Sequence, residues 1–186
     1  MPKTKVELLE NFLVVWNTTE GSQLYKLGYY GKPLGIAKPK VPEFDAPLVL
    51  DLMEGLYLVE TKKIEIFENT VDGEEKVSLK KLRQKAKLLY DEFEEKYMVY
   101  HDLRSSGLIV TPGIKFGCDF AVYKYGPGVE HAPYMVSVKK AGSEITATEI
   151  VKAGRLATTV RKRFIIAVPD SAADKVKYLI FKWFKA

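Results

Sequence analysis

Three side chains stand out as candidates for direct chemistry, because His101 and His131 are the only histidines and Cys118 is the only cysteine. No serine stands in a G-x-S-x-G turn, and Cys118 lies in an apolar alternation where a thiol is expected to be inert. We assign His101 and Cys118 to packing. Neither a Walker A sequence nor a G-x-G-x-x-G turn is present. The sequence therefore disfavours a nucleophilic hydrolase and nucleotide-dependent chemistry.

A metal-dependent nuclease centre needs carboxylates on neighbouring strands to hold the ion. Asp119 could supply the first carboxylate, but Ser137 stands two residues before Lys139, where the second acid is required. The spacing of cysteine and histidine fits no zinc or iron–sulfur site. We therefore expect no metal and no other cofactor.

The positive charge of the chain is confined to its second half. Residues 1–100 carry 15 Lys and Arg against 17 Asp and Glu, a net charge of −2. Residues 101–186 carry 14 against 7, a net charge of +7 within a total of +5. Such an excess favours a polyanionic partner, bound by the second half.

Metal-free cleavage of RNA is a reaction that this set of residues can perform. The ribose 2′-OH attacks the adjacent phosphate, so the protein supplies a base, an acid for the leaving 5′-oxygen and a cation for the phosphorane. His131 on a loop suits the acid, and Tyr123 at the end of a strand can meet the 2′-OH. A lysine at a strand edge can hold the developing charge.

The elements that position these residues follow from periodicity. Apolar alternation predicts a strand over residues 114–122, so Tyr123 points away from the face that carries Phe120 and Val122. A Gly-Pro-Gly loop then leads to His131. Three further strands are predicted beyond this loop, the last of them over residues 175–185, together with one helix.

These later elements have clear sequence signals. Residues 134–138 alternate as a strand, and residues 164–168 form the continuous apolar run of a central strand. Thr146 and Glu149 form a capping box, which opens a helix to about residue 159.

The sequence of the first half predicts a small domain of mixed helices and strands. It predicts, in order, a hairpin or small sheet over residues 12–30, a proline-rich loop over 31–47, a buried helix over 48–59 and a helix over 78–97. The pattern then changes from helical to strand-like. We therefore place an N-terminal mixed α/β domain at residues 1–98 and a second domain at residues 99–186.

Length and hydropathy add two limits. The 186 residues suffice for one or two domains with their own cores. No apolar run approaches the ~20 residues of a bilayer-spanning helix, and a single cysteine cannot form an internal disulfide. We expect a cytoplasmic protein with no membrane partner.

Several short motifs follow one another in the second half. The first, Y-x-D-L-R-x-x-G-L-x-V-x-x-G-x-K-F-G-x-D-F, begins at Tyr100. It is followed by Val-Tyr at Tyr123, by H-x-x-Y from His131 and by V-R-K ending at Lys162. Over residues 98–168 this order and spacing resemble the catalytic domain of archaeal tRNA-splicing endonucleases, the tRNA-intron lyases.

The resemblance implies a fold and a set of roles. The fold is a mixed α/β chain whose second, catalytic domain is restriction-endonuclease-like, with a central mixed sheet flanked by helices. The roles are general base for Tyr123, general acid for His131 and electrostatic stabiliser for Lys162. Arg155 matches an arginine that stacks on an extruded bulge base. The substrate is precursor tRNA, cut at bulge-helix-bulge splice sites to leave 2′,3′-cyclic phosphate and 5′-hydroxyl ends.

The resemblance also implies an oligomer. The long proline-rich loop resembles that of two-component catalytic chains, which implies a heterotetramer with a non-catalytic structural subunit, with a homotetramer as the alternative. Lys38 and Lys40 in this loop are candidate RNA contacts. Two rival functions are a non-catalytic RNA-binding or assembly subunit, disfavoured by the retained Tyr-His-Lys set, and a metal-dependent DNA nuclease, disfavoured by Ser137.

Overall fold

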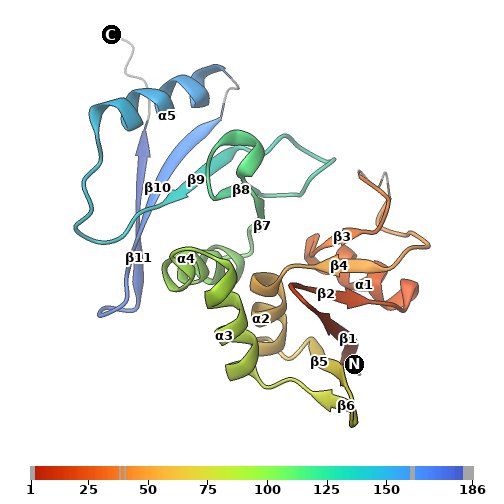
Figure 1. Cartoon of the computed structure of the whole chain (residues 1–186). Helices are drawn as coiled ribbons and strands as arrows, with labels where there is room; N and C mark the ends of the chain where they lie inside the picture. The colour runs from red at the N-terminus through yellow and green to blue at the C-terminus, as the bar shows by residue number, and fades with distance from the viewer. Residues whose placement is uncertain (1–2, 38, 40, 160–161, 182–186) are drawn as a thin grey trace. The chain divides into compact units, whose positions relative to one another are not determined.

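The computed structural model describes residues 3–37, 39, 41–159 and 162–181. The chain divides into two compact units, residues 1–93 and 94–186, each built around one mixed sheet (Figure 1). The mixed α/β class expected from the sequence is thereby confirmed. The boundary expected between residues 98 and 99 stays a prediction about independently folding domains. Within the described ranges, no helix is long and apolar enough to cross a membrane.

The first unit holds a six-stranded sheet in the order β3-β4-β2-β1-β5-β6. Its strands are β1 Thr4–Leu9, β2 Phe12–Val15, β3 Lys32–Pro33, β4 Leu48–Leu50, β5 Ile64–Thr70 and β6 Gly73–Lys76. Strands β1 and β5 pair in parallel, and the other neighbours are antiparallel. Its helices are α1 Thr18–Gly28, α2 Leu52–Glu60 and α3 Leu79–Leu89.

Helix α2 forms the buried centre of this unit. Asp51 and Glu54 close a capping box at its start, and Leu56 is fully buried. A Cβ atom on Gly55 would overlap the Cδ1 atom of Leu13. A larger residue at this position would therefore force the fully buried Leu13 of strand β2 to move.

The predicted hairpin or small sheet over residues 12–30 is only partly correct. Strand β2 forms a hairpin with β1, but residues 18–28 are helix α1. The side chain of Asn17 caps this helix by accepting a hydrogen bond from the Glu20 backbone N–H at 3.1 Å. The cap outweighs the strand preference of the aromatic residues that follow.

The single helix predicted over residues 78–97 is two helices. Helix α3 ends at Leu89, and α4 begins at Phe93. Between them Glu92 adopts a left-handed backbone with φ of 55°, which no continuing α-helix tolerates. The predicted start of this helix is confirmed, because the Ser78 Oγ atom caps α3 by accepting a hydrogen bond from the Lys81 backbone N–H at 3.2 Å.

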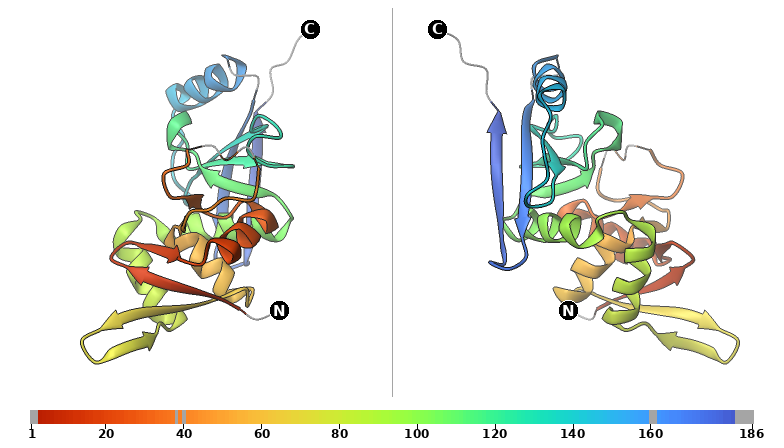
Figure 2. Two further views of the ribbon diagram at one scale, coloured as in Figure 1. Left: turned by 90° about the vertical axis from the view of Figure 1, so that its right-hand side faces the viewer. Right: turned by 60° about the vertical axis from the view of Figure 1, so that its left-hand side comes forward.

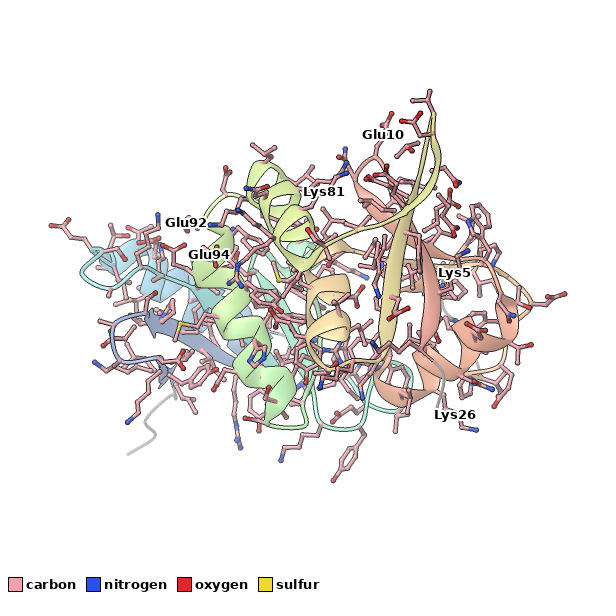
Figure 3. All side chains as sticks on the ribbon, turned by 90° about the horizontal axis from the view of Figure 1, so that it is seen from below. Lys5, Glu10, Lys26, Lys81, Glu92 and Glu94 are labelled. Atoms are coloured by element: carbon pink, nitrogen blue, oxygen red, sulfur yellow. The ribbon has the colours of Figure 1, made fainter. Side chains whose placement is uncertain are left out.

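Charged side chains form ion pairs on the surface of the first unit, among them those of Lys5 and Lys81, which Figure 3 labels. The Lys5 Nζ atom on β1 lies 2.6 Å from a carboxylate oxygen of Glu74 on the edge strand β6. Lys81 of α3 pairs with Glu68 of β5. A charged edge of this kind resists pairing with a strand from another chain.

The second unit holds a five-stranded sheet in the order β11-β10-β9-β8-β7. Its strands are β7 Ile109–Pro112, β8 Phe120–Tyr123, β9 Tyr134–Val138, β10 Arg163–Asp170 and β11 Lys175–Phe181. Strands β9 and β10 are parallel, and the other pairs are antiparallel. Helix α4 Phe93–Ser105, the short 3-10 helix η1 Ile114–Phe116 and helix α5 Ala147–Thr159 complete the unit.

Different helices cover the two faces of this sheet. On one face the Phe120 ring lies 6.0 Å from the ring of Tyr100 on α4. On the other face Met135 and Phe164 pack with Ala153 of α5. Figures 1 and 2 show α5 running beside β10. The central mixed sheet flanked by helices, expected for the second domain, is confirmed.

The strand predicted over residues 114–122 begins only at Phe120. Its first part is η1, which is followed by Gly117 with a left-handed φ of 67°. A Cβ atom on Gly113 would lie 2.7 Å from the carbonyl oxygen and from the Sγ atom of Cys118. The chain therefore folds back tightly here, and Cys118 joins the α5 face of the sheet.

Candidate active site

The pairing register brings the end of β8 and the start of β10 to the same end of the sheet. Val122 on β8 pairs with Tyr134 on β9, and Tyr134 pairs with Arg163 on β10. One residue beyond this row stand Tyr123 and Lys162. Their backbones are two strand spacings apart, which is about 10 Å.

Tyr123 and Lys162 also share one face of the sheet. Tyr123 alternates with Val122, so its side chain points to the α5 face, as the sequence predicts. The Lys162 Nζ atom lies 4.1 Å from the centre of the Phe116 ring, which packs against the cluster on that same face. The phenol of Tyr123 and the ammonium of Lys162 therefore lie on the same face of the sheet, at the same end.

The ammonium of Lys162 is partly withdrawn from water. Burial, the largest cause, lowers the pKa of Lys162, and Cys118 opposes this effect while the positive charge of Lys115 adds to it. The face of the Phe116 ring favours the charged form. A partly desolvated cation attracts an anion more strongly than a fully hydrated one does.

His131 is exposed in the loop that joins β8 to β9. The residue before it, Glu130, closes this loop. One carboxylate oxygen of Glu130 accepts hydrogen bonds from the backbone N–H groups of Lys124 at 2.5 Å and Tyr125 at 2.6 Å. His101 is exposed on α4, and its ring packs edge-on against the ring of the buried Tyr97, with 6.2 Å between the ring centres.

The predicted RNA contacts are spread over both units. Arg155 is exposed on α5, two residues after the buried Ala153. Its side chain leaves the helix about 200° away from that of Ala153. Lys38 and Lys40 lie outside the described residues.

Cys118 and Asp119 both serve the fold, and for Cys118 this confirms the predicted role in packing. Burial, and next the nearby Asp119 carboxylate, raise the pKa of Cys118 to about 11, which leaves its thiol inert. Asp119 accepts a hydrogen bond from the Val138 backbone N–H at 2.8 Å and pairs with Lys96 at 3.2 Å. Among the residues that the structure describes, no three His, Cys, Asp or Glu side chains are grouped to hold a metal ion.

Sequence reasoning missed two residues that contact this site. Phe116 stands in the K-F-G motif, but the alternation placed it on a strand rather than beneath a lysine. Glu130 follows a Gly-Pro-Gly turn and directly precedes His131. Its position next to a candidate acid was the available signal, but the target of its carboxylate depends on how the loop folds.

Comparison with known proteins identifies the family. Residues 4–83 match the tRNA intron endonuclease N-terminal domain, and residues 93–178 match the tRNA intron endonuclease catalytic C-terminal domain. The chain therefore belongs to the tRNA intron endonuclease family and is an endonuclease. The catalytic match spans Tyr123, His131 and Lys162.

Curated relatives agree along nearly the whole chain. The tRNA-splicing endonuclease of Hyperthermus butylicus is 46% identical over 172 residues, 92% of this chain and 93% of the relative. Those of Sulfurisphaera tokodaii and Saccharolobus solfataricus are 41% and 40% identical, over 96% and 97% of this chain and 98% of each relative.

Proposed function

We propose that this chain cuts precursor tRNA in the cytoplasm, at intron boundaries shaped as a bulge-helix-bulge, without a metal ion. The main support for the roles of these residues is the strand register of the five-stranded sheet, which we call the catalytic sheet. Tyr123 and Lys162 share one end and one face of that sheet, and His131 lies on the loop that joins β8 to β9. A separation of about 10 Å between the two backbones leaves room for a phosphodiester between the side chains.

The proposed reaction is a transfer within the RNA. Tyr123, as general base, takes the proton of the ribose 2′-OH, whose oxygen forms a bond to phosphorus as the bond to the 5′-oxygen breaks. His131 gives its proton to the leaving 5′-oxygen. Lys162 stabilises the charge on the non-bridging oxygens of the phosphorane. The products are a 2′,3′-cyclic phosphate and a 5′-hydroxyl, and no water is consumed.

The test is cleavage of an intron-containing precursor tRNA in EDTA, by the chain alone and with candidate partner chains, followed by analysis of the product ends. We expect cyclic phosphate and 5′-hydroxyl ends. Replacing the base or the acid, Tyr123→Phe or His131→Ala, should cost about 10²–10⁴-fold in rate. Lys162→Ala should cost about 10²–10³-fold.

Two results would defeat the proposal. Products with 3′-hydroxyl ends that need magnesium would indicate a metal-dependent nuclease. No cleavage with any partner chain would indicate a non-catalytic subunit.

The proposed assembly is a heterotetramer with a non-catalytic structural subunit, and a homotetramer is the alternative. Supporting an oligomer, the edge strand β11 carries Leu179 and Ile180, which are 50% and 49% exposed. The mass in solution of the chain alone and of its mixtures with partner chains distinguishes the two assemblies. A chain that cuts as a monomer would contradict both.

The proposed RNA contacts are Arg155, through stacking on a bulge base, and Lys38 and Lys40, through phosphates. Charge reversal of both lysines should weaken cleavage and flatten its salt dependence. Arg155→Ala should weaken RNA binding. Arg155→Lys should not restore it, because ring stacking uses the planar guanidinium. Unchanged cleavage of both minimal and atypical bulge substrates would remove the lysines from the interface.

A further inference from the structure

We infer that Glu130 is a positioning residue that fixes His131 relative to Tyr123. The inference rests on the proposed role of His131 as general acid. It starts from a carboxylate that lies beside the candidate acid in the sequence and that bonds to the backbone directly after the candidate base.

The contacts of Glu130 join the two ends of the loop over residues 124–130. Its Oε1 atom accepts from the backbone N–H groups of Lys124 and Tyr125, at 2.5 and 2.6 Å. Its own backbone N–H donates to the carbonyl oxygen of Gly126 at 3.2 Å. One residue therefore holds the segment that leaves Tyr123 against the segment that enters His131.

Burial of side chains contributes little to the order of this loop. Tyr125 and Val129 are 69% and 66% exposed, so they contribute little packing. Gly126 and Gly128 have left-handed φ values of 119° and 92°, and glycine loses the most backbone freedom on ordering. Hydrogen bonds from two N–H groups to an ionised carboxylate are stronger than neutral ones and offset that loss.

We call the two hydrogen bonds from the backbone of Lys124 and Tyr125 to the Glu130 carboxylate the clamp. The position of the clamp in the chain links it to the chemistry. Lys124 directly follows Tyr123, and Glu130 directly precedes His131. A general acid must lie within hydrogen-bond reach of the leaving oxygen, and a misplacement of about 1 Å can cost about 10²-fold in rate. Loss of the clamp should therefore slow the step that needs His131.

A change of leaving group isolates that step. An RNA whose scissile 5′-oxygen is replaced by sulfur expels a thiolate, which needs no proton from the protein. We expect Glu130→Ala to cut the oxygen substrate about 10–100-fold more slowly than the wild type in single turnover. It should cut the sulfur substrate at close to the wild-type rate. A general structural defect would slow both substrates equally.

Two further variants sharpen the comparison. Glu130→Gln keeps an oxygen that can accept both N–H groups but removes the charge, so its loss should be smaller than that of Glu130→Ala. Glu144→Ala removes an exposed glutamate in the loop before α5 and should leave both rates unchanged. Amide exchange at Lys124 and Tyr125 should accelerate in Glu130→Ala while the thermal midpoint of the chain changes little.

The same substrates test the underlying role separately. His131→Ala should be slow on the oxygen substrate and restored on the sulfur substrate. If it is not restored, the role of His131 as acid fails, and the inference fails with it. If His131→Ala is restored but Glu130→Ala is slowed equally on both substrates, the role of Glu130 alone is overturned.

Discussion

The ammonium of Lys162 lies 4.1 Å from the centre of the Phe116 ring, on the face of the catalytic sheet that α5 covers. Burial lowers the pKa of this lysine, and the ring face favours its charged form. Phe116 therefore contacts the ammonium that the proposed reaction uses as its cation.

Replacing the ring should weaken catalysis without abolishing it. Phe116→Leu removes a cation–π contact of about 0.5–2 kcal/mol, which corresponds to a roughly 2- to 30-fold lower single-turnover rate. Phe116→Tyr keeps an aromatic face and should retain most of the rate. In a Lys162→Ala background, Phe116→Leu should have almost no further effect on rate. A full additional loss there would mean that Phe116 acts through packing and not through the lysine.

The pair formed by Tyr178 and Asp102 should make stability fall at alkaline pH. The Tyr178 hydroxyl donates to Asp102 at 2.5 Å, and burial, followed by this carboxylate, raises the pKa of Tyr178. A raised pKa favours the neutral phenol in the folded state, so this stabilisation is present below about pH 10 and is lost as the pH rises further. Denaturant unfolding at pH 7 should show Tyr178→Phe less stable by about 1 kcal/mol.

Comparing the pH dependence of stability in the wild type and in Tyr178→Phe is the control for this prediction. Between pH 9 and 11, in steps bracketing the ordinary tyrosine pKa of about 10, wild-type stability should fall more steeply than that of Tyr178→Phe. Parallel curves for the two proteins would contradict the role of this hydroxyl.

The cap of α5 should make stability fall at acid pH. A hydrogen bond from Lys139 at 2.7 Å, followed by those from the Thr146 backbone and hydroxyl, lowers the pKa of Glu149 to about 2. A lowered pKa stabilises the fold above the ordinary glutamate value of about 4.3, and this contribution is lost as the pH falls toward 2. Thermal unfolding of Glu149→Gln should therefore depend less on pH in this window than that of the wild type.

The cap itself should contribute at neutral pH. Thr146 donates from its backbone to Glu149 at 2.9 Å, and its hydroxyl accepts from the Glu149 backbone N–H at 3.2 Å. Thr146→Ala should cost about 1 kcal/mol of unfolding free energy. Thr148→Ala, one residue into the helix, is the matched control and should change stability by much less. Equal effects of the two variants would exclude a capping role.

The thiol of Cys118 should resist alkylation in the folded protein. Its pKa is raised to about 11, chiefly by burial, whereas an unfolded thiol has a pKa of about 8.5. At pH 8 the thiolate fraction, and with it the iodoacetamide rate, should be about 200-fold lower in the native state than in denaturant. Comparable rates in both states would show that Cys118 is accessible and reactive.

Local signals predicted much of the catalytic unit. The capping box at Thr146 begins helix α5 where expected, and the apolar run over residues 164–168 lies within the central strand β10. Alternation also oriented Tyr123 correctly. These features depend on neighbours in the chain, so a sequence records them directly.

Local signals failed where the backbone changes direction although the apolar residues keep their regular spacing. The alternation over residues 114–122 continues through η1, and the helical spacing over 78–97 continues through Glu92. In both places the apolar residues keep a regular spacing while a left-handed backbone changes the direction of the chain. Periodicity reports which side chains are buried, but it does not report a reversal between them.

The sequence by itself determined which residues could do the chemistry, because their types, order and spacing carry the family motifs. Only the tertiary structure decided that Tyr123 and Lys162 lie on one face at one end of the sheet, since they are 39 positions apart and are placed there by the register of β8, β9 and β10. It also assigned partners to Phe116 and Glu130. The physical reason is that strand register and loop closure are set by contacts between distant segments.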